Sequence, residues 1–166
     1  MARRRSHERL YGPDGADLLE AFPATQIATF RDKPYHIHFR GVAAVDDSAL
    51  GWVARMPEIQ EIVANDTGIT GAGLRHLAAL PKLEILHLAG TPISAAAAAA
   101  LLNLPMVWQL DLSRTGIGEA GLLRLGAMPA LRRIWAVDCG LSEDAHSRIK
   151  RAMPQCRVIV DRSPGE

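Results

Sequence analysis

The chain contains a repeated pattern of fixed length, and this pattern constrains its fold more than any other feature. Residues 80–103 read LPKLEILHLAGTPISAAAAAALLN and residues 104–127 read LPMVWQLDLSRTGIGEAGLLRLGA, so the two copies are equal in length. Leucine, threonine and isoleucine recur at matching places in both copies. A repeat of roughly 20–50 residues is typical of a solenoid, in which successive units stack and share one hydrophobic core.

Further copies of the pattern flank these two. Clear repeats begin at Met56, Leu80, Leu104 and Met128, each with proline as its second residue, and a fainter one covers residues 35–55. Proline disfavours helix at the residue before it, so it ends the preceding helix. We therefore expect an α/β solenoid of five or six repeats of about 24 residues, with a parallel concave sheet and short convex helices.

The spacing of apolar residues assigns the inward side of each expected strand. Because successive side chains of a strand alternate between its two faces, the apolar positions point to the core and the residues between them point outward. We expect a final strand at residues 156–160, with Val158 and Val160 among the outward residues. The inward residues are Ile59, Ile62, Ala64, Leu83, Leu86, Leu88, Val107, Leu110, Leu112, Leu131, Ile134 and Ala136.

A small hydrogen-bonding residue stands at one fixed place after each expected strand. Thr67, Thr91, Thr115 and Cys139 each follow the last inward residue by three positions. The backbone groups of a turn need partners, and a nearby hydroxyl or thiol can supply one. We expect these four side chains to bond the backbone of the adjoining turn.

The motif L-P-x-L-x-x-L-x-L-x-x-T-x-I, with GITGAGL at residues 68–74, resembles short bacterial leucine-rich repeats of the ribonuclease-inhibitor-like or cysteine-containing subtype. The resemblance covers roughly residues 56–161. It implies a parallel sheet that lines a concave face, helices on the convex side, and a concave face that binds protein partners. A fold-level analogy of this kind names no partner.

The repeats divide the chain into four parts. Residues 1–14 are expected to form a flexible basic tail, and residues 162–166 a polar tail. The repeat domain spans residues 35–161, and residues 15–34 are expected to form an N-terminal cap. A cap is needed because the terminal unit of a stack must cover its apolar interior.

Composition narrows the class of protein. Lys and Arg total 19 against 18 Asp and Glu, which disfavours attraction of the whole surface to nucleic acid or membranes. Two cysteines, Cys139 and Cys156, do not suggest a disulfide scaffold and favour a cytoplasmic protein. We find neither a secretory signal nor an apolar run long enough to span a membrane.

The outward residues of the expected strands are the candidate site. Two large aromatic residues point outward there, Trp108 and Trp135, and Trp and Arg are enriched among the residues that dominate protein interfaces. Arginines gather at one end of the face and glutamates at the other, so the basic end suits an acidic partner. The predicted partner-binding residues are Trp108, Trp135, Arg133, Arg132, Asp111, His87, Glu84 and Arg157.

We predict no enzyme activity, cofactor or metal. The pair His36 and His38 lacks further ligands for a metal ion. A triad of His87, Asp111 and Ser113 would lack an oxyanion site, because backbone amides in a parallel strand are committed to the sheet. The favoured function is a non-enzymatic protein–protein interaction module. The alternatives are a structural accessory subunit and, third, a nucleic-acid binder that uses the basic tail and the arginine patch.

Overall fold

The computed structural model describes residues 14–23, 25–30, 33–39 and 44–160. The predicted polar tail and all but the last residue of the predicted basic tail lie outside the described residues. Residues 14–21 are helical. The remaining elements are β1 (Thr25–Phe30), β2 (Lys33–Phe39), α2 (Asp47–Val53), β3 (Glu61–Val63), the 3₁₀ helix η1 (Gly73–Ala79), β4 (Ile85–His87), η2 (Ala95–Ala97), α3 (Ala98–Leu101), β5 (Gln109–Asp111), α4 (Gly118–Leu125), β6 (Arg133–Trp135), α5 (Glu143–Ala152) and β7 (Arg157–Ile159).

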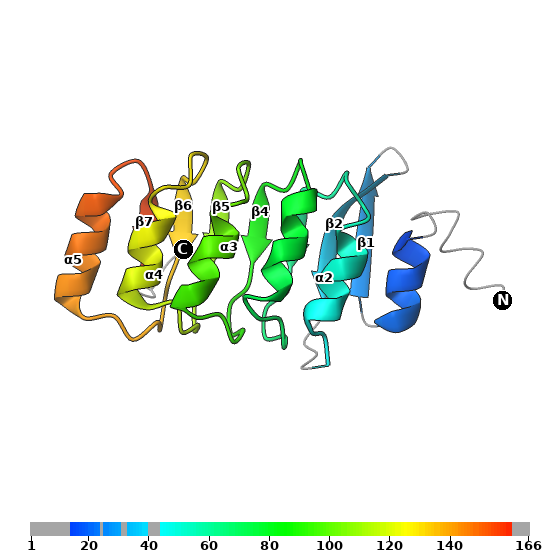
Figure 1. Ribbon diagram of the computed structural model, residues 1–166, viewed down its shortest axis with the longest axis horizontal. Helices are drawn as coiled ribbons and strands as arrows, with labels where there is room; N and C mark the ends of the chain where they lie inside the picture. The colour runs from blue at the N-terminus through cyan, green and yellow to red at the C-terminus, as the bar shows by residue number, and fades with distance from the viewer. Residues whose placement is uncertain (1–13, 24, 31–32, 40–43, 161–166) are drawn as a thin grey trace.

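The described strands form one sheet in chain order, from β1 to β7 (Figure 1). From β2 onward every strand is parallel to the next. From β3 onward each residue pairs with the residue 24 positions later, as Glu61 with Ile85 and Ile85 with Gln109. The helices follow one another on one face of this sheet (Figure 1). The opposite face, which we call the open face, carries none of the helices that the structure describes.

The sheet is mixed, which corrects the prediction of an entirely parallel sheet. Strand β1 pairs antiparallel with β2, and Ile27 lies opposite Ile37. Two residues connect Phe30 to Lys33, and a connection this short allows a hairpin but no crossover to a parallel strand. The sequence of residues 25–30 lacks the repeated pattern, so it predicts a cap there and no strand of the stack.

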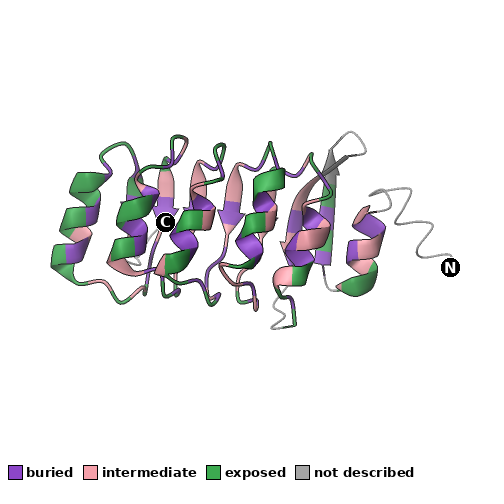
Figure 2. Ribbon diagram, in the orientation of Figure 1, coloured by how far each residue is buried: buried purple, intermediate pink, exposed green. Residues whose placement is uncertain are grey.

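The core lies between the sheet and the helices. Ile62, Leu86, Leu110 and Ile134 are the central residues of β3 to β6, and each is fully buried. The residues on either side of them are half-buried, so burial alternates along these strands as predicted. Figure 2 shows the alternation of buried and half-buried residues along the strands, and buried residues that recur along the helices. The helices contribute Leu74, Leu77, Ala98, Leu101, Leu122, Leu125 and Ile149 to the same core.

The predicted hydrogen bonds at the ends of the strands are confirmed. The hydroxyl groups of Thr67, Thr91 and Thr115 donate to the carbonyl oxygens three residues earlier, at 2.8, 2.5 and 2.6 Å. The thiol of Cys139 donates to the carbonyl of Leu112 at 3.1 Å. These bonds provide partners for buried carbonyl groups at the ends of the strands.

The alanine run at residues 95–100 allows neighbouring units to approach closely. A Cβ atom added to Gly71 would lie 2.9 Å from the Cβ of Ala97. On the other side, a Cβ added to Gly121 would lie 3.2 Å from the Cα of Ala95. Ala97 and Ala98 are buried. Other repeats carry a larger apolar residue near this place, such as Leu74 and Leu122, and here the small side chains allow closer contact between neighbouring units instead.

The turn after each central strand contains one residue in the left-handed region of backbone conformation. It falls at the same place in four successive units, at Asp66, Gly90, Arg114 and Asp138, with φ of 57°, 69°, 57° and 57°. Glycine adopts this conformation without strain and aspartate visits it occasionally, whereas arginine carries a steric cost there. Gly90 also leaves room for an ion pair above it, because an added Cβ would overlap the carboxylate of Asp66, which binds Arg114 at 2.8 Å.

The last strand is displaced by one residue from its predicted register. Val158 pairs with Ile134 and is buried, as is Val160, whereas both were predicted to point outward. The interval from Pro129 to Pro154 is one residue longer than the earlier intervals between prolines, which suggested a longer unit. The strand itself keeps the common offset, because the segment between the proline and the strand is one residue shorter. Arg157 and Ile159 therefore occupy the open face.

Candidate functional site

The strand register arranges the side chains of the open face in two rows. Because residues two positions apart in a strand share a face, each of β2 to β7 contributes one residue to each row. The first row is His36, Glu61, Ile85, Gln109, Arg133 and Arg157, and the second row is His38, Val63, His87, Asp111, Trp135 and Ile159. Five of the eight predicted binding residues stand in these rows, and the other three immediately precede the strands.

Trp135 is the centre of an aromatic and basic cluster on the open face. The guanidinium carbon of Arg133 lies 5.5 Å from the centroid of the tryptophan ring, in a cation–π contact. The ring centroids of His87 and Trp135 lie 6.4 Å apart, and the two ring planes are tilted by 34°. The indole is only half-buried, although both side chains lie beside it. It presents a large, positioned apolar surface to the outside.

Trp108, Glu84 and Arg132 lie at the edge of the sheet where the strands begin. The indole nitrogen of Trp108 donates to Glu84 Oε2 at 3.3 Å. Arg132 is exposed, and its Nη1 donates to the carbonyl oxygens of Pro129 at 3.0 Å and Leu131 at 2.9 Å. Trp108 is thus tied to the acidic side chain of the adjacent strand, and it is separate from the cluster around Trp135.

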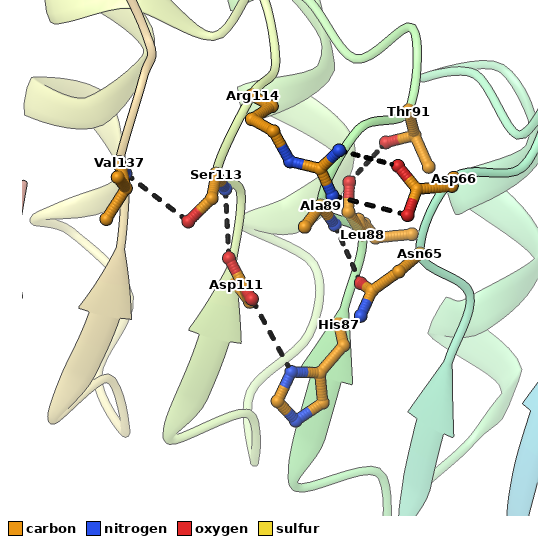
Figure 3. Close-up of polar contacts among 10 residues, drawn as sticks. All are labelled: Asn65, Asp66, His87, Leu88, Ala89, Thr91, Asp111, Ser113, Arg114 and Val137. Carbon is orange, nitrogen blue, oxygen red and sulfur yellow. Dashed lines mark hydrogen bonds and ion pairs between the residues drawn. The ribbon is translucent and has the colours of Figure 1, made fainter. Parts of the chain in front are cut away.

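His87, Asp111 and Ser113 lie in one polar chain, as Figure 3 shows. Nδ1 of His87 lies 3.8 Å from Asp111 Oδ2, and Oδ1 of the same carboxylate accepts the backbone N–H of Ser113 at 2.9 Å. The Ser113 hydroxyl accepts the N–H of Val137 at 3.3 Å. Asp111 therefore lies between the histidine and the serine, and the serine hydroxyl is engaged with the backbone of the next unit.

Asn65 has the same role as Ser113 in an earlier unit, and this role was not predicted from the sequence. Its side-chain oxygen accepts the N–H of Ala89 at 2.9 Å (Figure 3). Asn65 and Ser113 stand at equivalent places in their repeats. Their recurrence at a strand end was the available signal, because polar side chains there can pair backbone N–H groups of the neighbouring turn.

The environment of Asp111 shifts its titration. Burial raises the pKa of the Asp111 carboxyl, but its contacts with His87 and Ser113 together lower the pKa by more, so it lies below the ordinary value of an aspartate. A carboxyl whose pKa is lowered by folding stabilises the fold above its unfolded pKa. This stabilisation is lost as the pH falls through the folded pKa.

We predict that His87→Ala raises the pKa of Asp111. His87 is the largest of the contacts that lower the pKa, so its removal leaves the effect of burial less opposed. The measurement is a carboxyl carbon titration of Asp111 by NMR. The matched control is His76→Ala on η1, which lies away from the open face and should leave the titration unchanged. An unchanged titration in His87→Ala would contradict the assigned contact.

The described residues contain no group of three or more His, Cys, Asp or Glu placed to hold a metal ion. His36 and His38 stack with ring centroids 6.4 Å apart, and Nδ1 of His36 lies 3.5 Å from Glu61 Oε2. Within the part of the chain that the structure describes, every helix is too short or too polar to cross a bilayer.

Comparisons with known proteins identify the fold. No protein-family model matches the sequence, and no curated protein does. The C-terminal domain of Caenorhabditis elegans tropomodulin is similar in structure, with a TM-score of 0.56 and 15% identity over 73% of this chain and 83% of that one. Leiomodin-1 actin-binding site 2 has a TM-score of 0.57 and 11% identity over 72% and 79% of the two chains.

A leucine-rich-repeat protein of Leptospira interrogans matches with a TM-score of 0.49 and 18% identity, over 65% of this chain and 33% of that one. Identities this low speak only to the arrangement of the backbone. Together with the constant register between successive strands, the likenesses to the tropomodulin and leiomodin structures show a shared fold of mixed α and β structure.

Proposed function

We propose that the chain is a non-enzymatic protein-interaction module that binds a protein partner on the open face of its sheet. The observation that carries this proposal is the half-exposed ring of Trp135, with Arg133 and His87 beside it. Tryptophan and arginine are enriched among the few residues that dominate binding energy. A ring that is already held in place loses little side-chain freedom on binding, which favours affinity.

The proposal includes an adaptor role with a partner that is acidic where it meets β6 and β7. Arg133 and Arg157 are neighbours in the first row, and Arg132 precedes Arg133 at the edge of the sheet. Complementary charge increases the rate of association and selects among partners. One structure of similar fold is described as an actin-binding site of leiomodin-1, so the fold accommodates protein binding in that chain.

We also propose a bacterial, cytoplasmic solenoid of five or six repeats of the ribonuclease-inhibitor-like subtype. The regular strand offset supports the repeat assignment. Both cysteines are free thiols, which suits a reducing compartment. Burial raises the pKa of the Cys156 thiol to about 11, against a smaller opposing effect of Arg132, so this thiol stays protonated and unreactive at neutral pH.

The test is capture of partners from a lysate of the source organism by the tagged chain and by Trp135→Ala/Arg133→Ala. We expect the double variant to reduce capture of a specific partner by at least about tenfold, because truncation of such residues commonly costs about 2 kcal/mol or more. Circular dichroism should be unchanged, since neither side chain belongs to the buried core.

The matched control is Leu123→Ala/Arg124→Ala on α4, which also removes one apolar and one arginine side chain, but from the helical face. It should capture the partner normally. Full capture by Trp135→Ala/Arg133→Ala would contradict binding on the open face. Loss of capture in the α4 control alone would move the interface to the helices and favour the second candidate, a structural accessory subunit.

The accessory-subunit role ranks second because its sequence signal has an internal explanation. In the sequence, the alanine run at residues 95–100 gives this role faint support, because small side chains allow another surface to approach closely. Ala95 and Ala97 instead face Gly121 and Gly71 of neighbouring units. Binding of nucleic acid ranks third, since the open face carries acidic residues as well as arginines.

A further inference from the structure

Charge changes sign in order along the first row of the open face. From β3 to β7 the row reads Glu61, Ile85, Gln109, Arg133 and Arg157. The edge residues that precede β4 and β6 repeat this order, with an acidic side chain first and a basic one later. Along this row and edge, an acidic end, uncharged residues and a basic end therefore follow one another across the strands, while the second row adds Asp111 on β5.

The length of this charge gradient matches one element of secondary structure. Glu61 and Arg157 are separated by four strand spacings of about 4.8 Å, or roughly 19 Å. An α-helix rises about 1.5 Å per residue, so about 13 residues, or between three and four turns, cover this distance. The ends of one such helix can reach both charged ends of the face.

The backbone of the central strands favours a helix over an extended segment. Strands β3 to β6 are each paired on both sides, so their N–H and C=O groups are committed to the sheet. An extended partner lying on the open face would find no backbone groups there and would leave its own without partners. A helix satisfies its own backbone and offers only side chains.

Apolar side chains along the open face suit the apolar side of an amphipathic helix. Ile85 is half-exposed in the first row, and Val63 and Trp135 are half-exposed in the second row. Arg133 contacts the Trp135 ring, so the apolar and basic parts of the face are continuous. An amphipathic helix recognised in this way places apolar residues at intervals of three and four positions on the sheet.

We propose that the partner element is an amphipathic α-helix of three to four turns that lies across β3 to β7. Its basic end lies over Glu61 and Glu84, and its acidic end lies over Arg133 and Arg157. This inference rests on the proposed binding function of the open face and adds the kind of partner and its direction. A uniform polyanion such as nucleic acid is disfavoured, because the glutamates repel one end of it.

The test uses three synthetic peptides of about 14 residues, long enough to span the face as a helix. The first has an apolar stripe with glutamates at one end and lysines at the other. The second has the same composition with the charges interspersed, and the third is the first with a central proline that breaks the helix. We expect the first to bind at least about tenfold more tightly than either of the others in a fluorescence anisotropy titration.

Charge reversal on the protein tests the direction of binding. Arg133→Glu/Arg157→Glu should weaken the first peptide at least about tenfold, and adding Glu61→Arg/Glu84→Arg should restore its binding in the opposite direction. A spin label on the acidic end should broaden the amide signals of β6 and β7 in the native chain, and those of β3 and β4 in the fourfold variant. If the fourfold variant recovers binding and the broadened signals move to β3 and β4, the weaker binding of the double variant cannot be due to a loss of folding.

Three outcomes would overturn the proposal. Equal binding of the first two peptides, or none by the first, would remove the charge gradient as the basis of recognition. Equal binding of the proline peptide would assign an extended partner. Tighter binding of a single-stranded oligonucleotide would assign a nucleic acid. In each case the capture experiment with Trp135→Ala/Arg133→Ala still decides independently whether a protein binds the open face.

Discussion

Leu110→Ala is expected to lower the free energy of unfolding by about 2–5 kcal/mol, the range for truncating a buried leucine. Leu110 is 0% exposed at the centre of β5, between Leu86 of β4 and Ile134 of β6. Truncation of its side chain leaves a cavity in the middle of the stack, between the two neighbouring units. The units on either side are fixed by their own strand pairing, so the cavity cannot close fully.

The measurement is urea unfolding followed by circular dichroism, with the slope of the transition compared as well as its midpoint. Leu123→Ala is the matched control, because Leu123 lies on α4 with 37% exposure. It should change the free energy of unfolding by less than about 1 kcal/mol. Similar losses in both variants would mean that the core does not pass through β5 as described.

Gly73→Ala is expected to lower the free energy of unfolding by about 1–3 kcal/mol, the usual cost of overpacking. An added Cβ would lie 2.7 Å from Cγ of Asp47. That carboxylate cannot easily move away, because it accepts the N–H and the hydroxyl of Thr70, both at 2.7 Å. The substitution therefore disturbs the contact that ties α2 to the turn before η1.

Gly51→Ala provides the opposite result from the same chemical change. Gly51 lies inside α2, and an added Cβ would meet no atom within 4 Å. Alanine should raise the free energy of unfolding by about 0.5–1 kcal/mol, because glycine loses more backbone freedom in a helix. Thermal unfolding of both variants measures the two signs together, and a loss of stability in Gly51→Ala would contradict the open space beside α2.

The sequence predicted the central units well because their constraints are local and repeated. Alternation within a strand and recurrence from one unit to the next assigned both the buried residues, such as Leu86, and the outward ones, such as Trp135. The hydroxyl bonds of the threonines followed from the same recurrence. No repeat covers residues 25–30, so β1 and its antiparallel pairing had no pattern that could reveal them.

The predictions were wrong where a residue that usually marks the register or the turn stands at a different place from the structural feature. Pro154 suggested a register that the last strand does not follow, and Val158 was assigned to the wrong face. The left-handed turn was hidden because Asp66 and Arg114 occupy a position where glycine is the usual signal. Contacts between side chains, such as that of Trp108 with Glu84, depend on rotamers that the spacing of residues does not determine.

The constant offset between successive strands determines how the open face of such a protein can change in length during evolution. Duplicating one complete unit, such as residues 85–108, would insert one strand and leave the facing of every other strand intact. The open face would lengthen by about 4.8 Å, while inserting any other number of residues would have to be absorbed in a turn. Duplication of complete units in the gene can thus lengthen this surface by one strand at a time, without changes to the residues of the core.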